Sequence, residues 1–413
     1  MIPLTPMKLH QNLALGVING LEAIFLKEEL AQYYIPSLLK KNPKWGSRDR
    51  RLVSQILYDS IRWKRLYEDT IKKKVVDKKD LWSLLGCWLL LHDYPLPDWE
   101  EFKEIEPDAL HKNHEAACQI RAVKQSIPDW LDTAGENAFG ASIWEEELKS
   151  LNQTAAFVIR VNRLKITPEK LQRLLLKELN VRSNTLKEYP DALIFEKQIN
   201  LKNSAVFKKG YFEIQDANSQ LVATCVAAKP GMTVIDACAG AGGKTLHLAT
   251  TMQNKGKIIA LDVHDKKLQE LKKRATRNGV NIVECSMADS PDFFIEWEGK
   301  ADRVLIDAPC SGLGVIKRYP DTKWKMNPKK IQELLQLQQK ILRKNAKLVK
   351  VDGTLTYATC TLFPNENQEQ IDAFLTDSHG KEFKLIESKT FFSHQTGFDA
   401  FFMATLKRIN VNK

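Results

Sequence analysis

The pattern of hydrophobic and polar positions changes twice along the chain, and each change predicts a domain boundary. In residues 1–150 the apolar positions recur with a helical period. In residues 151–210 short extended runs surround one helical stretch, and in residues 211–413 short apolar runs alternate with helical ones. We therefore expect a helical domain, a small α/β unit and a larger α/β domain, because a chain of this length exceeds one typical core.

The clearest helix of the first region carries an apolar stripe, with Ser47 as its expected N-cap. The stripe residues stand at helical spacing: Leu52, Val53, Ile56, Leu57 and Ile61. The surrounding residues are basic: Arg48, Arg50, Arg51, Arg62, Lys64 and Arg65. Such a charge run is typical either of a solvated helix face or of a surface that binds a polyanion, and the pattern leaves both interpretations open.

The second region begins with a strand at Phe157–Val161. Thr167-Pro168-Glu169 is a good helix start for the stretch that ends at Leu179. Three further short strands are expected, at Val181–Ser183, Ala192–Phe195 and Gln198–Leu201. Together these segments predict a compact α/β unit.

The third region predicts a largely parallel sheet. Its expected strands are Thr233–Asp236, Lys257–Asp262, Ile282–Cys285, Arg303–Ile306 and Thr354–Tyr357. Helical stretches lie between most of them, such as Asp265–Arg277 and Pro328–Leu348. This alternation indicates helices on both faces of the sheet, and ligands of such sheets bind at the carboxyl ends of the strands.

Charge and cysteine content narrow the function classes. The 413-residue chain has a formal net charge of +11, which suits a polyanionic partner such as a nucleic acid. The seven cysteines form no CxxC pair, so we expect free thiols and no metal site. No stretch approaches the roughly 18 apolar residues of a membrane helix. The segment from Met1 to Leu15 lacks the features of a secretory signal, so we expect a cytoplasmic monomer without a membrane partner.

Polar and small residues gather where the first three strands of the expected sheet end. The first strand runs into a glycine-rich turn made of Cys238, Ala239, Gly240, Ala241, Gly242, Gly243 and Lys244. Small residues let the backbone pass close to a ligand, and the following helix offers free N–H groups. Asp262 ends the second strand, 26 residues after Asp236, about where an acid binds a ribose in such folds. Asp289 follows the third strand, where it could accept from an adenine amine, so the series predicts an adenosine pocket.

Two cysteines stand where the next two strands end. The fourth strand leads into Asp307-Ala308-Pro309-Cys310, and the fifth leads into Thr359-Cys360. A thiol beside an adenosine pocket suits methylation at carbon 5 of a pyrimidine, because a thiolate that adds to carbon 6 makes carbon 5 nucleophilic. A free thiol has a pKa of about 8.5, so nearby cationic or N–H groups must favour its ionised form.

The same chemistry needs a proton donor and a base. We expect Asp307, as a carboxyl with a raised pKa, to donate a proton to cytosine N3 while the thiolate adds. A base must then remove the hydrogen at carbon 5 before the thiolate leaves, and the second cysteine is a candidate for that step. The spacing leaves open which of Cys310 and Cys360 is the nucleophile.

At these residues the chain resembles the Sun/Nop family of RNA cytosine-C5 methyltransferases. The likeness spans the chain and is sharpest from Phe212 to Asn367. The motifs that show it are Gln215-Asp216 with Ser219-Gln220, Asp236 to Thr245, Asp307 to Gly312, Arg318-Tyr319-Pro320-Asp321 with Trp324, Thr359-Cys360, and Pro364-Asn365-Glu366-Asn367. Family members usually have Ala-Pro where this chain has Gly240-Ala241.

The resemblance implies roles for the site residues. It implies that Cys360 is the nucleophile and that Cys310 aids product release. It also implies that the cofactor is S-adenosylmethionine, bound by residues 238–244 together with Asp262, Asp289 and Asp307. The resemblance further implies a Rossmann-like methyltransferase domain at 211–413, a ferredoxin-like unit at 151–210 and a NusB-like RNA-binding domain at 1–150. The NusB likeness rests on Asp49 to Arg65.

The expected function is therefore methylation of cytosine C5 in RNA, with 16S ribosomal RNA as the first candidate and transfer RNA as the second. An amino-group methyltransferase is disfavoured, because such enzymes typically have two prolines and an aromatic residue where this chain has Ala308-Pro309-Cys310. A non-catalytic RNA-binding factor of ribosome assembly is the other alternative. The presence of both cysteines and of the full series of acids argues against it.

Overall fold

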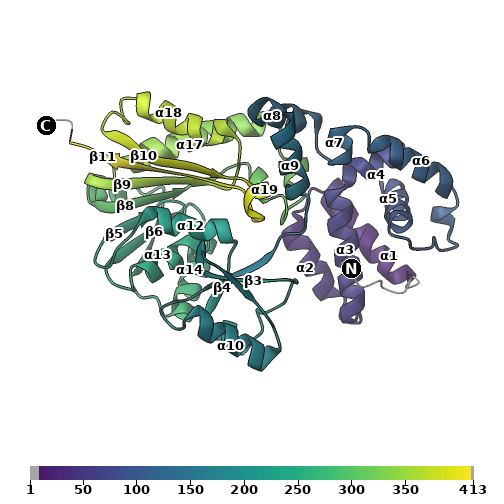
Figure 1. Cartoon of the computed structure of the whole chain (residues 1–413), viewed down its shortest axis with the longest axis horizontal. Helices are drawn as coiled ribbons and strands as arrows, with labels where there is room; N and C mark the ends of the chain where they lie inside the picture. Colours follow the sequence, from purple (N-terminus) through teal and green to yellow (C-terminus); the bar gives the residue numbers. More distant parts are fainter. Residues whose placement is uncertain (1–8, 411–413) are drawn as a thin grey trace. The chain divides into compact units, whose positions relative to one another are not determined.

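The computed structural model describes residues 9–410, so residues 1–8 and 411–413 of the first and third expected domains lie outside it. The chain forms two compact units. Met1–Asn152 and Ile316–Asn327 make up a helical unit, and Gln153–Val315 and Pro328–Lys413 make up an α/β unit. Figure 1 labels their elements. Among the described residues, no helix has the length and apolar character needed to cross a membrane.

The helical unit confirms the helical pattern of the first region. Its helices are α1 (Gln11–Leu21), a π-helix (Glu22–Leu26), α2 (Ala31–Lys41), α3 (Ser47–Arg62), α4 (Lys64–Thr70), α5 (Lys78–Leu91), a 3-10 turn (Glu100–Phe102), α6 (Pro107–Ala117), α7 (Arg121–Lys124), α8 (Asp129–Phe139), α9 (Ala141–Leu151) and α16 (Thr322–Lys325). The expected stripe on α3 is buried. The N-cap of α3 is Gly46 rather than Ser47, because the Asp49 carboxylate accepts from the Gly46 N–H at 2.9 Å.

Three of the basic residues around this stripe have structural partners. Arg50 Nη2 donates to the carbonyl oxygen of Asn42 at 2.8 Å. Arg62 is buried, and its Nη2 donates to the carbonyl oxygen of Lys317 at 2.9 Å. Arg65 Nη1 donates to the carbonyl oxygen of Ile127 at 2.6 Å. A role in holding the helical unit together therefore accounts for these three side chains, which the charge pattern could not distinguish from a nucleic-acid surface.

The segment Ile316–Asn327 belongs to the helical unit, although the sequence pattern puts it within the third region. Trp324 Nε1 donates to the carbonyl oxygen of Ile61 at 2.6 Å. Lys323 is fully buried, and its Nζ donates to the carbonyl oxygen of Arg62 at 2.8 Å. Burial lowers the pKa of Lys323 well below its ordinary value. Part of the family-like motif around Tyr319 to Trp324 is therefore a structural element of the helical unit.

The small sheet of the α/β unit is antiparallel, in the order β2-β3-β1-β4. Its strands are β1 (Phe157–Val161), β2 (Asn184–Leu186), β3 (Tyr189–Phe195) and β4 (Phe212–Ile214), and its helices are α10 (Pro168–Leu179) and α11 (Ala205–Lys208). This confirms the first strand and the helix that follows it. Two expected strands were wrong. Val181 N–H instead closes the end of α10 on Leu175 O at 3.1 Å, and Leu201 O accepts from Ser204 N–H in the turn before α11.

The large sheet has the order β10-β11-β9-β8-β5-β6-β7. Its strands are β5 (Thr233–Asp236), β6 (Lys257–Asp262), β7 (Val283–Met287), β8 (Ala301–Asp307), β9 (Val349–Thr359), β10 (Phe383–Phe391) and β11 (Phe401–Arg408). Strands β5 to β9 pair in parallel, as expected, and β11 is antiparallel to its neighbours. The Rossmann-like fold is confirmed, but the sequence reading did not foresee β10 and β11.

Helices cover both faces of this sheet (Figure 1). One face holds α12 (Ala217–Val226), α13 (Gly243–Thr251) and α14 (Asp265–Asn278), and the other holds α15 (Pro291–Trp297), α17 (Pro328–Ala346) and α18 (Gln368–Thr376). The remaining short helices are two 3-10 turns (Leu313–Val315 and Pro364–Glu366) and α19 (Ser393–Thr396). The two apolar cores leave the carboxyl ends of β5 to β9 available for polar side chains.

The small sheet meets the large one at the end of α14. Gly210 has a φ of +70°, and a Cβ there would lie 2.0 Å from the carbonyl oxygen of Arg277. Asn162 Nδ2 bridges this approach, because it donates to Gly210 O at 2.8 Å and to Asn278 O at 2.9 Å. Only glycine meets both the backbone conformation and the close contact at this position.

Gly210→Ala should therefore lower the free energy of unfolding by about 3 kcal/mol or more, from left-handed strain and steric overlap together. The matched control is Gly231→Ala, since Gly231 has a φ of +90° but open space where its Cβ would stand. Strain alone should destabilise that variant by about 1 kcal/mol. Urea unfolding of both variants measures the difference, and equal effects would contradict the close approach.

Candidate active site

The turn between β5 and α13 is shaped by two glycines with left-handed backbone. Gly240 has a φ of +56° and Gly242 a φ of +86°. A Cβ on Gly242 would lie 2.5 Å from the Leu271 side chain of α14, whereas one on Gly240 or Gly243 would meet nothing within 4 Å. The turn therefore packs tightly against α14 on one side and has open space beside Gly240 and Gly243. The first N–H groups of α13 are available there, as at any helix start.

Acids lie at three strand ends near this turn. Asp236 is fully buried, its Oδ2 accepts from Thr245 Oγ1 at 2.7 Å, and burial raises its pKa to about 7. Asp262 Oδ2 accepts from the Gly240 N–H at 2.9 Å, so this acid also fixes the turn. Asp289 is exposed after β7, where its charge lies close to Lys344. The expected acid series is thus spread along the edge of the sheet.

The two candidate catalytic cysteines lie next to each other. Strands β8 and β9 pair in parallel with Asp307 opposite Ala358, which brings the residues after both strands to the same edge. The Sγ atoms of Cys310 and Cys360 are 3.3 Å apart. The hydrogen bond with Cys360 and burial together raise the pKa of the Cys310 thiol well above its ordinary value. The Cys310 thiol is therefore protonated at neutral pH.

A lysine pairs with the acid and interacts electrostatically with the nucleophile candidate. Lys244 Nζ donates to Asp307 Oδ2 at 2.6 Å and lies 5.3 Å from the centre of the Phe401 ring. Burial opposes the charge of Lys244, but Asp307, with a smaller contribution from Cys360, more than compensates and raises the pKa of Lys244. The sequence reasoning grouped Lys244 with the cofactor turn and missed this place beside Asp307 and Cys360. The cation that a reactive thiol needs was already visible in Gly243-Lys244-Thr245.

Asp307 is engaged differently from the sequence expectation. We expected a carboxyl that holds its own proton for cytosine N3, but its Oδ2 is bound to an ammonium group. The ion pair with Lys244 therefore has to be considered as one unit in the chemistry of the site.

A buried carboxylate fixes the loop that bears Cys310. Glu366 Oε2 accepts from the Ser311 N–H at 2.8 Å and from Gln338 Nε2 at 3.0 Å, and its Oε1 accepts from Ser311 Oγ at 2.5 Å. Gln338 Nε2 also donates to the carbonyl oxygen of Pro309 at 3.0 Å. The short turn that contains Glu366 thus holds the segment on both sides of Cys310.

The neighbouring Asn367 holds the segment around Cys360. Its Oδ1 accepts from Thr359 Oγ1 at 2.5 Å, and its Nδ2 donates to the carbonyl oxygen of Thr361 at 3.0 Å. The sequence reasoning used Pro364-Asn365-Glu366-Asn367 only as a family motif. Its structural role, which is to hold both cysteine loops, could be recognised only from the three-dimensional contacts.

Comparison with known proteins identifies the family. The family described as 16S rRNA methyltransferase RsmB/F matches residues 223–407, and the ferredoxin-like domain of RsmF/B-like methyltransferases matches residues 127–202. A Bacillus subtilis protein named probable ribosomal RNA small subunit methyltransferase B is 34% identical over 395 residues, which is 87% of each chain. A Synechocystis protein of the same name is 34% identical over 303 residues, or 68% of this chain and 67% of that one.

Solved structures agree with the fold. The crystal structure of a protein designated PH0851 matches with a TM-score of 0.81 and 27% identity, and covers 98% of this chain and 100% of that one. The structure of NSun6 from Pyrococcus horikoshii with SFG has a TM-score of 0.63 at 23% identity, with 69% of this chain and 99% of that chain covered, and bears on the fold alone.

The residues present fit S-adenosylmethionine. The turn has open space beside Gly240 and Gly243, acids follow β5, β6 and β7, and the first turn of α13 presents N–H groups. These features and the resemblance noted in the sequence agree with the comparisons. Because a relative with 34% identity spans 87% of both chains, this chain belongs to the RsmB/F family of 16S rRNA methyltransferases and uses S-adenosylmethionine as its cofactor.

Proposed function

We propose that this chain methylates carbon 5 of a cytosine in small-subunit ribosomal RNA, through a transient bond between Cys360 Sγ and carbon 6 of the base. The observation that carries the proposal is the 3.3 Å contact between the sulfur atoms of Cys310 and Cys360, beside the ion pair of Lys244 and Asp307. S-adenosylmethionine, when bound, supplies an electrophilic methyl group. The chain's own residues must make carbon 5 nucleophilic.

In this proposal Cys360 is the nucleophile. The positive charge of Lys244 interacts with Cys360, and a cation favours a thiolate over a thiol. The raised pKa of Cys310 keeps the neighbouring sulfur protonated, so one negative charge rather than two has to be stabilised. The thiolate adds to carbon 6, and the electron pair of the 5,6 double bond becomes available at carbon 5.

Addition of the thiolate also moves negative charge toward cytosine N3. We propose that the pair of Lys244 and Asp307 supplies the proton-donating group there, with Lys244 as the proton carrier and Asp307 as its partner. After methylation the hydrogen at carbon 5 must leave as a proton. Cys310 is proposed to assist that step: with the Cys360 sulfur bound to carbon 6 and uncharged, Cys310 gives its proton to Lys244, which has passed its own proton to N3, and the resulting Cys310 thiolate accepts the hydrogen of carbon 5 as a proton. Cys360 is then expelled as a thiolate, N3 releases its proton to solvent, and the aromatic ring is restored.

The substrate follows from charge and family. A net charge of +11 suits RNA, and the curated relatives are named for the small-subunit ribosomal RNA. A paired cytosine would have to leave its helix to reach the thiol. We further propose the division into residues 1–150, 151–210 and 211–413, with the first part as an RNA-binding domain of NusB type. The monomeric state and the cytoplasmic location stay predictions.

Bisulfite sequencing tests the proposed product. Small-subunit RNA that lacks the modification is incubated with S-adenosylmethionine and protein, and the wild-type chain should protect one or more cytosines from conversion. Cys360→Ala should abolish this protection and leave RNA binding intact, because the nucleophile alone is removed. Methyl transfer to another atom, or to transfer RNA only, would refute the proposal.

Denaturing gels separate the roles of the two cysteines. Cys310→Ala should accumulate a protein–RNA adduct that survives denaturation, because the bond to Cys360 forms but breaks slowly. The double variant of Cys310 and Cys360 should form no adduct. Cys118→Ala, a change in the helical unit, is the matched control and should behave as wild type. An adduct that persists in the double variant would contradict the assignment of Cys360.

Glu366→Gln tests the clamp on the Cys310 loop. Glutamine keeps the size of the side chain but turns an NH₂ group toward donors from Ser311 and Gln338. The loop should lose order, and kcat should fall about tenfold or more with a smaller change in the KM for S-adenosylmethionine. The control Glu369→Gln changes an exposed carboxylate three residues after Glu366 and should leave kcat unchanged. Equal kcat values for both variants would argue against the clamp.

A further inference from the structure

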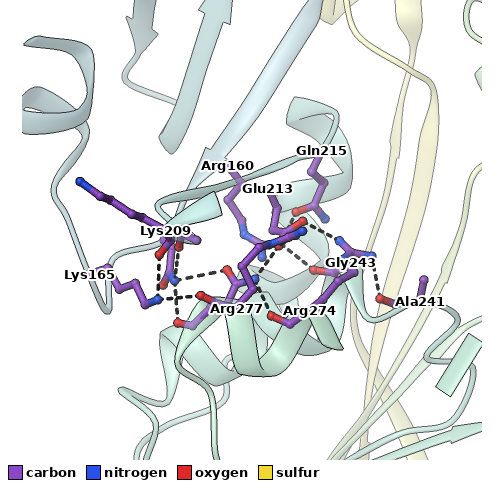
Figure 2. Close-up of polar contacts among 12 residues, drawn as sticks. Arg160, Lys165, Lys209, Glu213, Gln215, Ala241, Gly243, Arg274 and Arg277 are labelled. Atoms are coloured by element: carbon purple, nitrogen blue, oxygen red, sulfur yellow. Dashed lines mark hydrogen bonds and ion pairs between the residues drawn. The ribbon is translucent and has the colours of Figure 1, made fainter. Parts of the chain in front are cut away.

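A cluster of buried charges lies behind the cofactor turn, as Figure 2 shows. Its centre is Glu213 on β4, which stands opposite Arg160 of β1 in the small sheet. Glu213 Oε2 accepts from Arg274 Nη2 at 2.9 Å, and Oε1 accepts from Arg277 Nη2 and from Asn278 Nδ2, both at 2.5 Å. Glu213 and Arg160 are 3% and 2% exposed, so the centre of this charge cluster is almost completely removed from water, whereas Arg274 and Arg277 are half-buried.

Two arginines of the cluster reach the cofactor turn. Arg274 Nη1 donates to the carbonyl oxygen of Ala241 at 2.6 Å, and Arg160 Nη1 donates to the carbonyl oxygen of Gly243 at 2.6 Å (Figure 2). These carbonyl groups flank Gly242, whose φ is +86°. The two bonds therefore fix the peptide group that precedes Gly242 and the one between Gly243 and Lys244. Arg160 Nη1 also donates to the Gln215 side chain.

Charge interactions within the cluster compensate for the burial of its members. Burial would favour a neutral Glu213, but Arg274, Asn278 and Arg277 outweigh it and hold the pKa of this carboxyl below its usual range. Burial, with a smaller contribution from Arg274, lowers the pKa of Arg160 to about 10, and Glu213 opposes the decrease. Glu213 is therefore a fixed negative charge that offsets the cost of burying the Arg160 guanidinium group at the turn.

Other contacts already attach the small sheet to α14. Lys165 Nζ donates to the carbonyl oxygens of Lys209 and Arg277 at 2.8 and 2.6 Å, and Asn162 bridges Gly210 and Asn278. Burying guanidinium groups opposes folding unless they are paired, so simple attachment does not explain Arg160 and Arg274. The bonds to Ala241 and Gly243 do explain them.

We propose that Arg160 and Arg274 are positioning residues for the cofactor turn, and that the negative charge of Glu213 stabilises both of them there. By holding the two carbonyl groups on the side of the small sheet, they pre-form the turn whose other side receives S-adenosylmethionine. Cofactor binding by the large sheet therefore depends on a charge supplied by the small one.

Titration calorimetry of the full chain with S-adenosylmethionine, without RNA, tests this inference. Arg274→Met keeps the apolar stem and removes the guanidinium group, and should raise the Kd about tenfold, as expected for a lost hydrogen bond to a charged group. The KM for S-adenosylmethionine should rise by a similar factor, and kcat at saturating cofactor should change less than about threefold. Glu213→Gln and Arg160→Met should act in the same direction.

Arg277→Met is the matched control. Arg277 lies on the same helix and binds the same carboxylate, but its guanidinium group packs on Phe207 at 4.1 Å rather than reaching the turn. Its Kd should stay within about twofold of wild type, even where thermal unfolding followed by circular dichroism shows a loss of stability similar to that of Arg274→Met.

Three results would overturn the inference: an unchanged Kd in Arg274→Met, an equal rise in Arg277→Met, or a loss confined to kcat. If Arg160→Met fails to fold, Arg274→Met decides the question. Because no RNA is present, failure of the proposed cytosine chemistry would leave this measurement unchanged. Absence of cofactor binding by the wild-type chain would overturn the inference itself.

Discussion

The contact between the sulfur atoms of Cys310 and Cys360 is the interaction on which the proposed chemistry of the site depends. Two thiolates 3.3 Å apart would repel each other strongly, so the pair is stable with one negative charge but not with two. The raised pKa of Cys310 assigns the proton to that sulfur, and the ammonium of Lys244 favours the charge on Cys360. Two residues of the same type thereby become chemically different, which is what an addition followed by an elimination requires.

This arrangement rests on side chains that take no part in the reaction. Glu366 and Asn367 are buried neighbours, and each spans a different cysteine loop through several hydrogen bonds. The segment from Ala308 to Gly312 consists of small residues and a proline, so it offers little side-chain packing of its own. Fixing them from a neighbouring turn keeps the sulfur atoms in place while leaving the space around them open to a base.

Local patterns predicted the parts of the fold that depend on local sequence. The alternation of apolar runs located β5 and β6 at their observed limits, and strand ends identified the two cysteines before any contact was known. The membership of Ile316–Asn327 in the helical unit could not be predicted, because it depends on bonds such as that between Trp324 and Ile61, far apart in sequence. The ion pair of Lys244 and Asp307 was missed for the same reason.

The cofactor turn shows why such distant contacts are needed. Residues 238–243 have small side chains or none beyond hydrogen, so a ligand can approach the backbone, but the turn cannot then hold itself by packing. Its carbonyl groups must be held by donors from elsewhere, and long charged side chains can deliver donors across a domain boundary. Arginines need a buried counter-charge in that position, which Glu213 provides. A turn that is open toward its ligand therefore requires a polar support on its other side, and Arg160 of the small sheet and Arg274 of α14 supply that support.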